Sequence, residues 1–413
     1  MDVPGIDKLF ICYIPGMDLR RINTNNAPYI TRLFNLYPWA KIKTLPNVEL
    51  VPTLLTGVYP HEHGIWQVKL RSDQSSSLKY RLIDEIPDIL ITTFQCLVHL
   101  FNQSFDLAAI PSKRRRLLEL KRFKYTRREK SSEILFRIGG VESIFSIVGK
   151  GKGKYVFSKK FDGLDKLLYN LCSQDYRLEF LELYSLDILQ HWNLDETNEI
   201  SKFYRGIDNF VKNLHEKCQS KNSTLMILSD HGQEQVKGSI DIKKELKKLN
   251  LPENEYNFYT EVPMARFWFH TDRARRKIVD MLYSIDNGTV LSYKDMHKYN
   301  VKFDDDEYGE IYFIVDPGYI IFPHDFYQPL ANIFLGLTDW QQRSRIFNPK
   351  HRGVHGYLPQ YDSERGFIMI LDHNNYRIDK RDVDIIDVAP SILGLLGYGK
   401  ANYMEGNCIF NTK

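Results

Sequence analysis

The segment Thr224-Leu-Met-Ile-Leu-Ser-Asp-His-Gly232 holds a candidate strand and candidate functional residues side by side. Its first five residues form a continuous apolar run, which is typical of a strand buried on both faces in a parallel sheet. Similar runs occur at Lys8–Ile14 and Gly366–Leu371, and predicted helices separate the three along the chain. Strands that alternate with helices predict an α/β fold, with a mostly parallel sheet covered by helices on both faces.

The overall composition narrows the class of protein. The chain has 413 residues, of which 43% are hydrophobic and 26% charged, and this excludes collagen, coiled coils and largely disordered chains. A formal net charge of +4 is too small to indicate nucleic-acid binding. The five cysteines are scattered without a CxxC pair, which argues against a disulfide framework and a Cys-rich zinc site. Because the N-terminus also lacks a basic segment before its first apolar run, we expect a cytoplasmic protein.

The longest apolar stretch, Ile89–Phe101, has 13 residues and contains several polar side chains. A helix needs about 20 mostly apolar residues to cross a bilayer. The stretch therefore predicts a buried or interfacial helix and no transmembrane segment.

A change of character between residues 67 and 175 predicts a helical, basic insertion that could act as a cap within a single domain spanning residues 1–413. Its segment Lys113–Lys130 has ten basic and two acidic residues, a net charge of +8, so the rest of the chain sums to −4. Two interpretations remain open. The charges belong to a solvated helix face, or they form a site that attracts anions, whether a nucleotide, a polyphosphate or a membrane surface.

Three short clusters contain side chains that bind metals. Asp187 and His191 are four residues apart, which places them on one face of a helix. Asp230 and His231 follow a buried strand, at the sheet edge where α/β proteins build their sites. His355 lies in Gly353-Val-His355-Gly356. Two aspartates and three histidines form a mixed oxygen and nitrogen set that suits zinc, with manganese or iron as alternatives.

Two further motifs point to a known family. Pro52-Thr-Leu-Leu-Thr-Gly-Val-Tyr-Pro-His-Glu-His-Gly-Ile65 contains the pattern TG-x-x-P-x-x-HG, and Asp387-Val-Ala-Pro-Ser-Ile-Leu-Gly-Leu-Leu-Gly397 resembles a D-x-x-P-T-x-L-x-x-L-G ending. Together with the three clusters, in this order, the chain resembles the alkaline phosphatase superfamily, in its type I phosphodiesterase/nucleotide pyrophosphatase-like branch. The resemblance implies a three-layer α/β sandwich and a metal-dependent hydrolase of phosphodiester or pyrophosphate bonds in a small, nucleotide-like substrate.

The resemblance also implies a role for each cluster. Asp187, His191 and His355 correspond to the ligands of one zinc ion, and Asp230 and His231 to two ligands of a second. In the family, an aspartate after the first strand and the nucleophile complete the second site. Two metals at such a site clamp the transferring phosphoryl group.

The chain departs from the family at those last two positions. Pro15-Gly16 stands where the family has Asp-Gly, and proline cannot bind a metal. Asn47 occupies the usual place of the nucleophile, while Thr44 lies in a Thr-Leu-Pro-Asn segment similar to that of the diesterases. Thr44 or a metal-bound hydroxide is then the expected nucleophile, with Asn47 orienting the substrate. A catalytically silent relative that binds a phosphorylated ligand or a protein partner through the basic insertion is the alternative, and a phosphomutase is a third.

Overall fold

The computed structural model describes residues 5–46, 49–70, 85–101, 110–115, 117–121, 135–159, 161, 163–172, 175–372 and 376–412. The chain divides into two compact units. The first consists of Met1–His63, Phe123–Gln233 and Pro359–Lys413, and the second of Gly64–Arg122 and Glu234–Leu358. Each unit is described by itself.

A seven-stranded sheet forms the centre of the first unit, and six of its strands run in the same direction. The exception is β18, which is antiparallel to both of its neighbours. The prediction of an α/β fold around a mostly parallel sheet is therefore confirmed. In sheet order, the strands are β20 (Asp382–Asp384), β2 (Trp39–Lys43), β18 (Arg365–Ile370), β9 (Thr224–Ser229), β1 (Leu9–Tyr13), β8 (Leu178–Leu183) and β7 (Gly153–Ser158).

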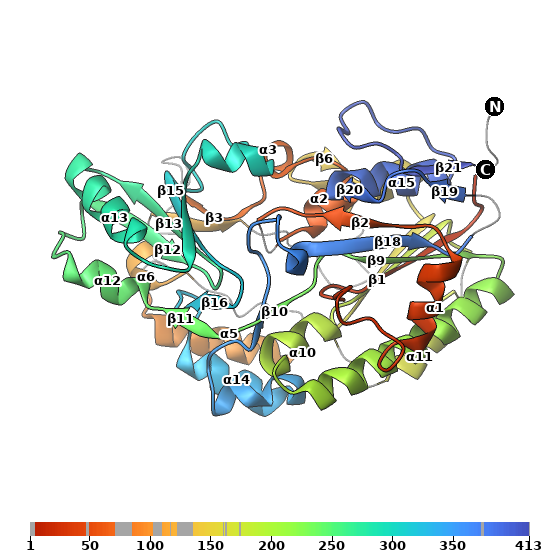
Figure 1. The fold of residues 1–413 in the computed structure, drawn as a ribbon, viewed down its shortest axis with the longest axis horizontal. Helices are drawn as coiled ribbons and strands as arrows, with labels where there is room; N and C mark the ends of the chain where they lie inside the picture. The colour runs from red at the N-terminus through yellow and green to blue at the C-terminus, as the bar shows by residue number, and fades with distance from the viewer. Residues whose placement is uncertain are drawn as a thin grey trace. The chain divides into compact units, whose positions relative to one another are not determined.

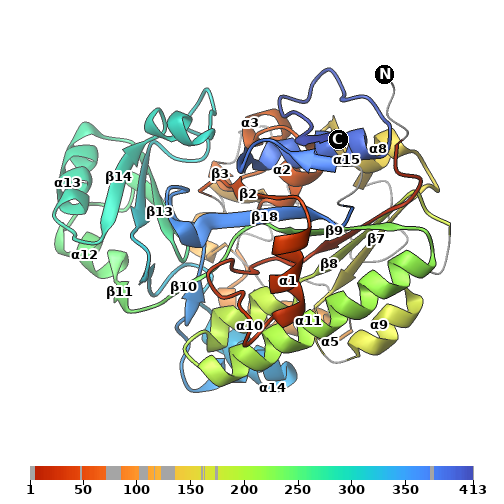
Figure 2. The same cartoon turned by 45° about the vertical axis from the view of Figure 1, so that its right-hand side comes forward.

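Helices cover both faces of this sheet and complete three layers (Figures 1 and 2). One face carries α1 (Pro28–Leu36), α9 (Leu164–Asn170), α10 (Ser185–Asn193) and α11 (Thr197–Ser220). The other carries α2 (Val51–Thr56), α8 (Ile144–Val148) and α15 (Val388–Leu395). The short helix α3 (Pro60–His63) follows α2. Two-stranded ladders join β5 (Arg137–Ile138) to β6 (Val141–Glu142) and β19 (Tyr376–Ile378) to β21 (Phe410–Thr412).

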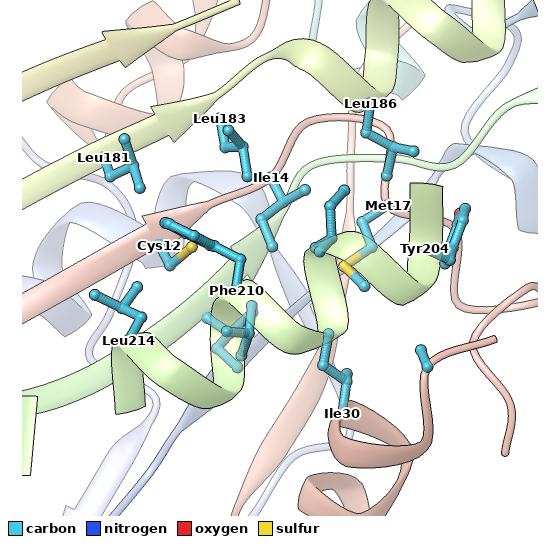
Figure 3. Close-up of a cluster of buried hydrophobic side chains, with 14 of the residues drawn as sticks. Cys12, Ile14, Met17, Ile30, Leu181, Leu183, Leu186, Tyr204, Phe210 and Leu214 are labelled. Carbon is cyan, nitrogen blue, oxygen red and sulfur yellow. The ribbon is translucent and has the colours of Figure 1, made fainter. Parts of the chain in front are cut away.

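The core between the sheet and α11 explains why these elements form (Figure 3). Cys12 and Ile14 come from the continuous apolar run of the first strand, and both are fully buried. Phe210 and Leu214 are four residues apart on α11, so they lie on the same face of that helix and pack into the same cluster. Burial on both faces of the sheet is what the uninterrupted apolar strands require.

The second unit is built around an antiparallel sheet in the order β12 (Tyr256–Thr260), β13 (Met264–Phe269), β15 (Ile311–Val315) and β14 (Gly288–Ser292). Its helices are α5 (Asp88–Phe101), α6 (Ser112–Arg115), α12 (Ile242–Lys248), α13 (Asp272–Tyr283) and α14 (Pro329–Thr338). Small ladders pair β3 (Gln67–Leu70) with β4 (Leu118–Lys121), β10 (Glu234–Gln235) with β17 (Gly353–Val354), and β11 (Gly238–Ile240) with β16 (Tyr319–Ile321). Among the described residues of the chain, no helix is long and apolar enough to cross a membrane.

The segment predicted as a helical insertion, residues 67–175, is divided between the two units. Its described part contains α5, α6, α8 and α9, and it also contains strands. One of them, β7, is an edge strand of the central sheet and pairs in parallel with β8. The residues of β7 are half-buried, which fits an edge strand. Because of this partial exposure, the sequence of β7 resembles that of a polar insertion. That the segment caps a site stays a prediction.

Candidate active site

The candidate site residues of the first unit lie at one edge of the central sheet. Strand β1 lies between β8 and β9, and all three are parallel, so their carboxyl ends meet at this edge. Asp187 follows β8, and Asp230 follows β9 directly. The carboxyl edge of a parallel sheet is where α/β proteins bind their ligands.

Asp187 and His191 form the first pair. Helix α10 begins two residues after β8, and the four-residue spacing places Asp187 Oδ2 3.5 Å from His191 Nε2. The Asp187 side chain is buried, whereas 19% of the His191 side chain is exposed. Gln233 donates from its amide nitrogen to Asp187 Oδ1 at 2.6 Å and to the Asp187 carbonyl at 3.1 Å. Gln233 therefore fixes the Asp187 carboxylate, and the His191 imidazole beside it reaches solvent.

Asp230 and His231 form the second pair, and the protein itself supplies its hydrogen bonds. Tyr13 donates its hydroxyl to Asp230 Oδ2 at 2.6 Å, and Gly16 donates its backbone N–H to Oδ1 at 3.3 Å. The backbone N–H of His231 also donates to Oδ1, at 3.0 Å. The His231 ring lies with Nε2 3.2 Å from Asp230 Oδ2 and Nδ1 2.8 Å from the Gly232 carbonyl oxygen. Both residues of this pair are buried.

The charges of this second pair follow from its surroundings. Burial on its own would lower the pKa of His231, but the Asp230 carboxylate, with Asp187 and Glu364 beyond it, raises the pKa to about 10. Burial and the neighbouring Asp230 also raise the pKa of the Tyr13 hydroxyl, so Tyr13 stays a donor. This raised pKa favours the protonated ring, whose Nε2 faces Asp230 and whose Nδ1 faces the Gly232 carbonyl oxygen. Binding a metal through this ring would require it to lose a proton.

Ile14 and then Pro15 follow β1, so no carboxylate stands in the place where the family has its acid. Asp18, three residues further on, is buried, and Arg20 binds it through its Nε at 3.0 Å and its Nη2 at 2.7 Å. The same Arg20 donates to the Gln233 carbonyl oxygen at 2.9 Å. Asp18 is thus part of an ion pair that fixes the chain after β1.

The two candidate catalytic residues are placed differently. Asn47 lies outside the described residues. Thr44 follows β2 and is buried, and its hydroxyl donates to the Glu364 carbonyl oxygen at 2.7 Å. This bond links the end of β2 to the residue before β18.

His355 belongs to the second unit. It directly follows β17, which pairs with β10, and its side chain is buried. Its assignment as a ligand, together with those of Asp187, His191, Asp230 and His231, stays a prediction.

The basic segment holds two arginines whose partners are internal to the second unit. Arg114 lies 2.9 Å from the buried Asp325 carboxylate and 3.5 Å above the centre of the Phe258 ring. Arg115 is buried and pairs with Asp88 at 3.0 Å. Both arginines have carboxylate partners inside the second unit, and Lys243 shares Asp325 with Arg114. That the basic segment attracts anions stays a prediction. Arg116 lies outside the described residues.

Sequence reasoning missed Tyr13 and Gln233. Tyr13 is one aromatic residue in an apolar strand, and its bond to Asp230 spans 217 positions, so no local pattern reveals it. Gln233 immediately follows Ser229-Asp-His-Gly232, and this adjacency was the one available signal.

The three-layer sandwich and the acid–histidine pairs at its carboxyl edge define an alkaline-phosphatase-like α/β fold. Residues 121–358 match the family model described as type I phosphodiesterase / nucleotide pyrophosphatase. This match covers more than half of the chain, and the chain belongs to that family of phosphodiesterase and pyrophosphatase-type hydrolases. No curated protein sequence matches the chain.

Solved structures agree on the fold. Murine ectonucleotide pyrophosphatase/phosphodiesterase 5 superposes with a TM-score of 0.62 at 15% identity, over 98% of this chain and 100% of that one. The human protein of the same name gives 0.60 at 15% identity with the same coverage. An inactive murine variant in complex with AMP gives 0.58 at 14% identity, again over 98% and 100%. At this level of identity the likeness shows the fold alone.

Proposed function

We propose that the protein is a divalent-metal-dependent hydrolase of phosphodiester or pyrophosphate bonds in a nucleotide-like substrate. The observation that carries this proposal is the Asp187–His191 pair at the carboxyl end of β8, with its imidazole reaching solvent. Membership of the phosphodiesterase family supports the reaction. The AMP complex of a structural neighbour supports a nucleotide-like substrate.

The donor set fits a zinc ion. Asp187 offers a carboxylate oxygen and His191 a ring nitrogen, and the family resemblance adds His355 as the third ligand. When bound, the ion supplies Lewis-acid polarisation of the phosphoryl group and of a water molecule. Gln233 fixes the orientation of the Asp187 carboxylate through its hydrogen bond to Oδ1, which is how residues behind a metal ligand keep its geometry.

We propose water as the nucleophile, in preference to Thr44. The Thr44 hydroxyl is buried and already donates to a backbone carbonyl, so attack by this oxygen needs both movement of the loop and loss of that bond. A role for Asn47 in orienting the substrate stays a prediction, as does the cytoplasmic location.

The test combines metal analysis with hydrolysis of chromogenic substrates. We expect at least one zinc per chain and turnover of bis-p-nitrophenyl phosphate in the wild type. His191→Ala removes a ligand and should reduce both metal content and turnover by at least about 100-fold. His270→Ala replaces an exposed histidine of the second unit and should match the wild type. Full turnover in His191→Ala would contradict the proposed site.

A catalytically silent binding protein is the second candidate, and the replacement of the first-strand acid by Pro15 favours it. If the wild type contains no metal and hydrolyses neither a phosphodiester nor a phosphomonoester, this candidate replaces the hydrolase. Equilibrium binding of AMP without turnover would then be the measurement that supports it.

A further inference from the structure

Helix α5 exposes its most apolar side chains. Six of its large residues have between 51% and 89% of their surface accessible, and Phe101 is the most exposed of them. They are Ile89, Leu90, Phe94, Leu97, Leu100 and Phe101. Exposed apolar residues are ordinary when single, but a contiguous group marks a surface that binds something.

The exposed apolar side chains of α5 gather on one side of the helix. With about 3.6 residues per turn, the six exposed residues fall within an arc of about 140° on one side of α5. The two residues that α5 buries are Thr92 and Cys96, and both lie outside that arc. A helix of an ordinary globular protein buries the apolar side and exposes the polar one. Thr93 is exposed within the arc, and Ile91 and Val98 on the opposite side are half-buried, so α5 buries only part of its apolar surface and exposes its leucines and phenylalanines.

Helix α14 packs against α5 in the same unit and shows the same property (Figure 1). Leu330, Ile333 and Leu337 recur at helical spacing and are exposed, Leu337 to 73%. The rings of His99 on α5 and Phe334 on α14 lie 6.0 Å apart, so the two helices are direct neighbours. The apolar surface therefore extends over two helices.

Positive charge follows each of these helices in the sequence. Residues 89–101 and 329–338 contain no Asp, Glu, Lys or Arg. After α5 comes the basic segment Lys113–Lys130, which retains eight basic residues and two acidic ones when the internally paired Arg114 and Arg115 are set aside. Arg115 pairs with Asp88, so this segment starts beside the first turn of α5. Residues 339–352, after α14, contain four basic residues and one acidic residue, and three basic residues remain when Arg345, which donates to Asn332 and Gln342, is set aside.

We propose that the α5–α14 surface docks onto an anionic lipid bilayer, with its apolar side chains entering the interface and the positive charge of the adjoining sequence favouring anionic headgroups. Surface helices that bind membranes combine an apolar face with nearby cations in this way. At 14 residues α5 is about 21 Å long, shorter than the roughly 30 Å of a bilayer core, so it lies along the surface. This docking does not depend on the proposed hydrolase activity.

The test is co-sedimentation of the full chain with vesicles of phosphatidylcholine, with and without about 30% phosphatidylserine. We expect binding to the anionic vesicles, weaker binding to the neutral ones, and loss of binding at about 0.5 M NaCl. The double variant Leu97→Ser, Phe101→Ser should reduce the partition coefficient at least tenfold, because both side chains leave water on docking. Tyr283→Ser is the matched control, since Tyr283 is 71% exposed at the end of α13, and it should bind as the wild type does.

Other outcomes overturn the proposal. The proposal is overturned if the wild-type protein stays in the supernatant or if it binds neutral and anionic vesicles equally. It is also overturned if the double variant binds like the wild type. A wild-type dimer that the double variant converts to a monomer, without vesicle binding, would assign the surface to a second copy of the chain. Hydrolysis of a soluble diester without vesicles should be the same in the double variant and the wild type, which separates this test from that of the proposed function.

Discussion

Two Asp–His pairs flank β1 at the same sheet edge, and they differ in how the protein treats them. In the first, Asp187 and His191 approach to 3.5 Å and the His191 ring reaches solvent. In the second, Asp230 and His231 approach to 3.2 Å, and only 4% of the His231 side chain is exposed. Tyr13 and Gly16 of the neighbouring strand and turn donate to Asp230. The first pair is accessible to a ligand, and the second is enclosed by its own hydrogen bonds.

This difference teaches that residue type and position at the sheet edge do not settle a function. Both pairs consist of one carboxylate and one imidazole, and both follow a strand of the central sheet. Pro15 stands where the family has an acid after the first strand, and Asp230 accepts hydrogen bonds from a hydroxyl and from backbone amides. The enclosed pair should therefore matter most for stability, and the accessible pair for metal binding and turnover.

The largest effect should come from Asp230→Ala. The substitution leaves the Tyr13 hydroxyl, the Gly16 N–H and the buried His231 imidazolium without their acceptor. Removing one partner of a buried ion pair destabilises by about 3–5 kcal/mol. We expect a loss of this size in the free energy of unfolding, measured by urea denaturation of the metal-free protein.

Two controls frame this result. Asp286→Ala removes an exposed aspartate of the second unit and should change stability by less than about 0.5 kcal/mol. His191→Ala should also keep nearly wild-type stability while losing metal. If Asp230→Ala instead keeps wild-type stability and loses metal, Asp230 is a ligand and the two pairs are alike.

A smaller effect should appear in the pH dependence of the free energy of unfolding. It comes from His63, a buried histidine whose pKa is lowered by burial. His63 is buried, with Nε2 3.0 Å from Thr53 Oγ1, and burial, aided by His61, lowers its pKa to about 3. Between that pKa and the ordinary value of 6.5, the unfolded chain binds a proton that the folded chain does not. Stability is then full above pH 6.5 and falls as the pH drops, by about 1.4 kcal/mol per pH unit for one such group.

The measurement is the urea-unfolding free energy at pH 7 and at pH 5. Burial also lowers the pKa of His324 to about 3 and lowers that of His215, so His63 is one of several groups that set the slope. His63→Gln should remove the share of one group, about 1.4 kcal/mol per pH unit. An unchanged slope in this variant would mean that His63 is protonated in the folded protein.

Local patterns in the sequence predicted much of the first unit. The continuous apolar runs became β1, β9 and β18, since burial on both faces leaves no room for alternation. The spacing of Asp187 and His191 sufficed to bring them together, because four residues make about one helical turn. Both results depend only on residues close in sequence.

The features that the sequence did not predict depend on residues far apart in the chain or on the direction of a strand. An apolar run does not encode strand direction, so the antiparallel β18 was not foreseen. The charge of Arg114 suggested an anion site, but its partner Asp325 is 211 positions away. Composition identified the apolar helix α5, whereas the exposure of its leucines and phenylalanines depends on what packs against it.

The smallest effect, and the sharpest test of the comparison, comes from Tyr13→Phe. Loss of the hydroxyl removes one donor from Asp230 and leaves the ring in place, so we expect a cost of about 1–2 kcal/mol in the free energy of unfolding. Tyr155→Phe is the matched control, because Tyr155 also donates to a carboxylate of this sheet, but to that of Glu182 and not to Asp230. Both variants should lose stability, but only Tyr13→Phe frees an oxygen of Asp230.

Metal content then shows whether Asp230 and His231 form a second metal site that the Tyr13 hydroxyl blocks. In the double variant Tyr13→Phe, Pro15→Asp an acid stands after β1 and the competing hydroxyl is gone. If the first-strand acid is what the second site lacks, zinc per chain should rise by one relative to the wild type, and added zinc should raise the melting temperature of the double variant more than that of Tyr155→Phe. Unchanged zinc content in a folded double variant would mean that Asp230 and His231 serve the fold alone, and that chemistry at this edge depends on Asp187 and His191.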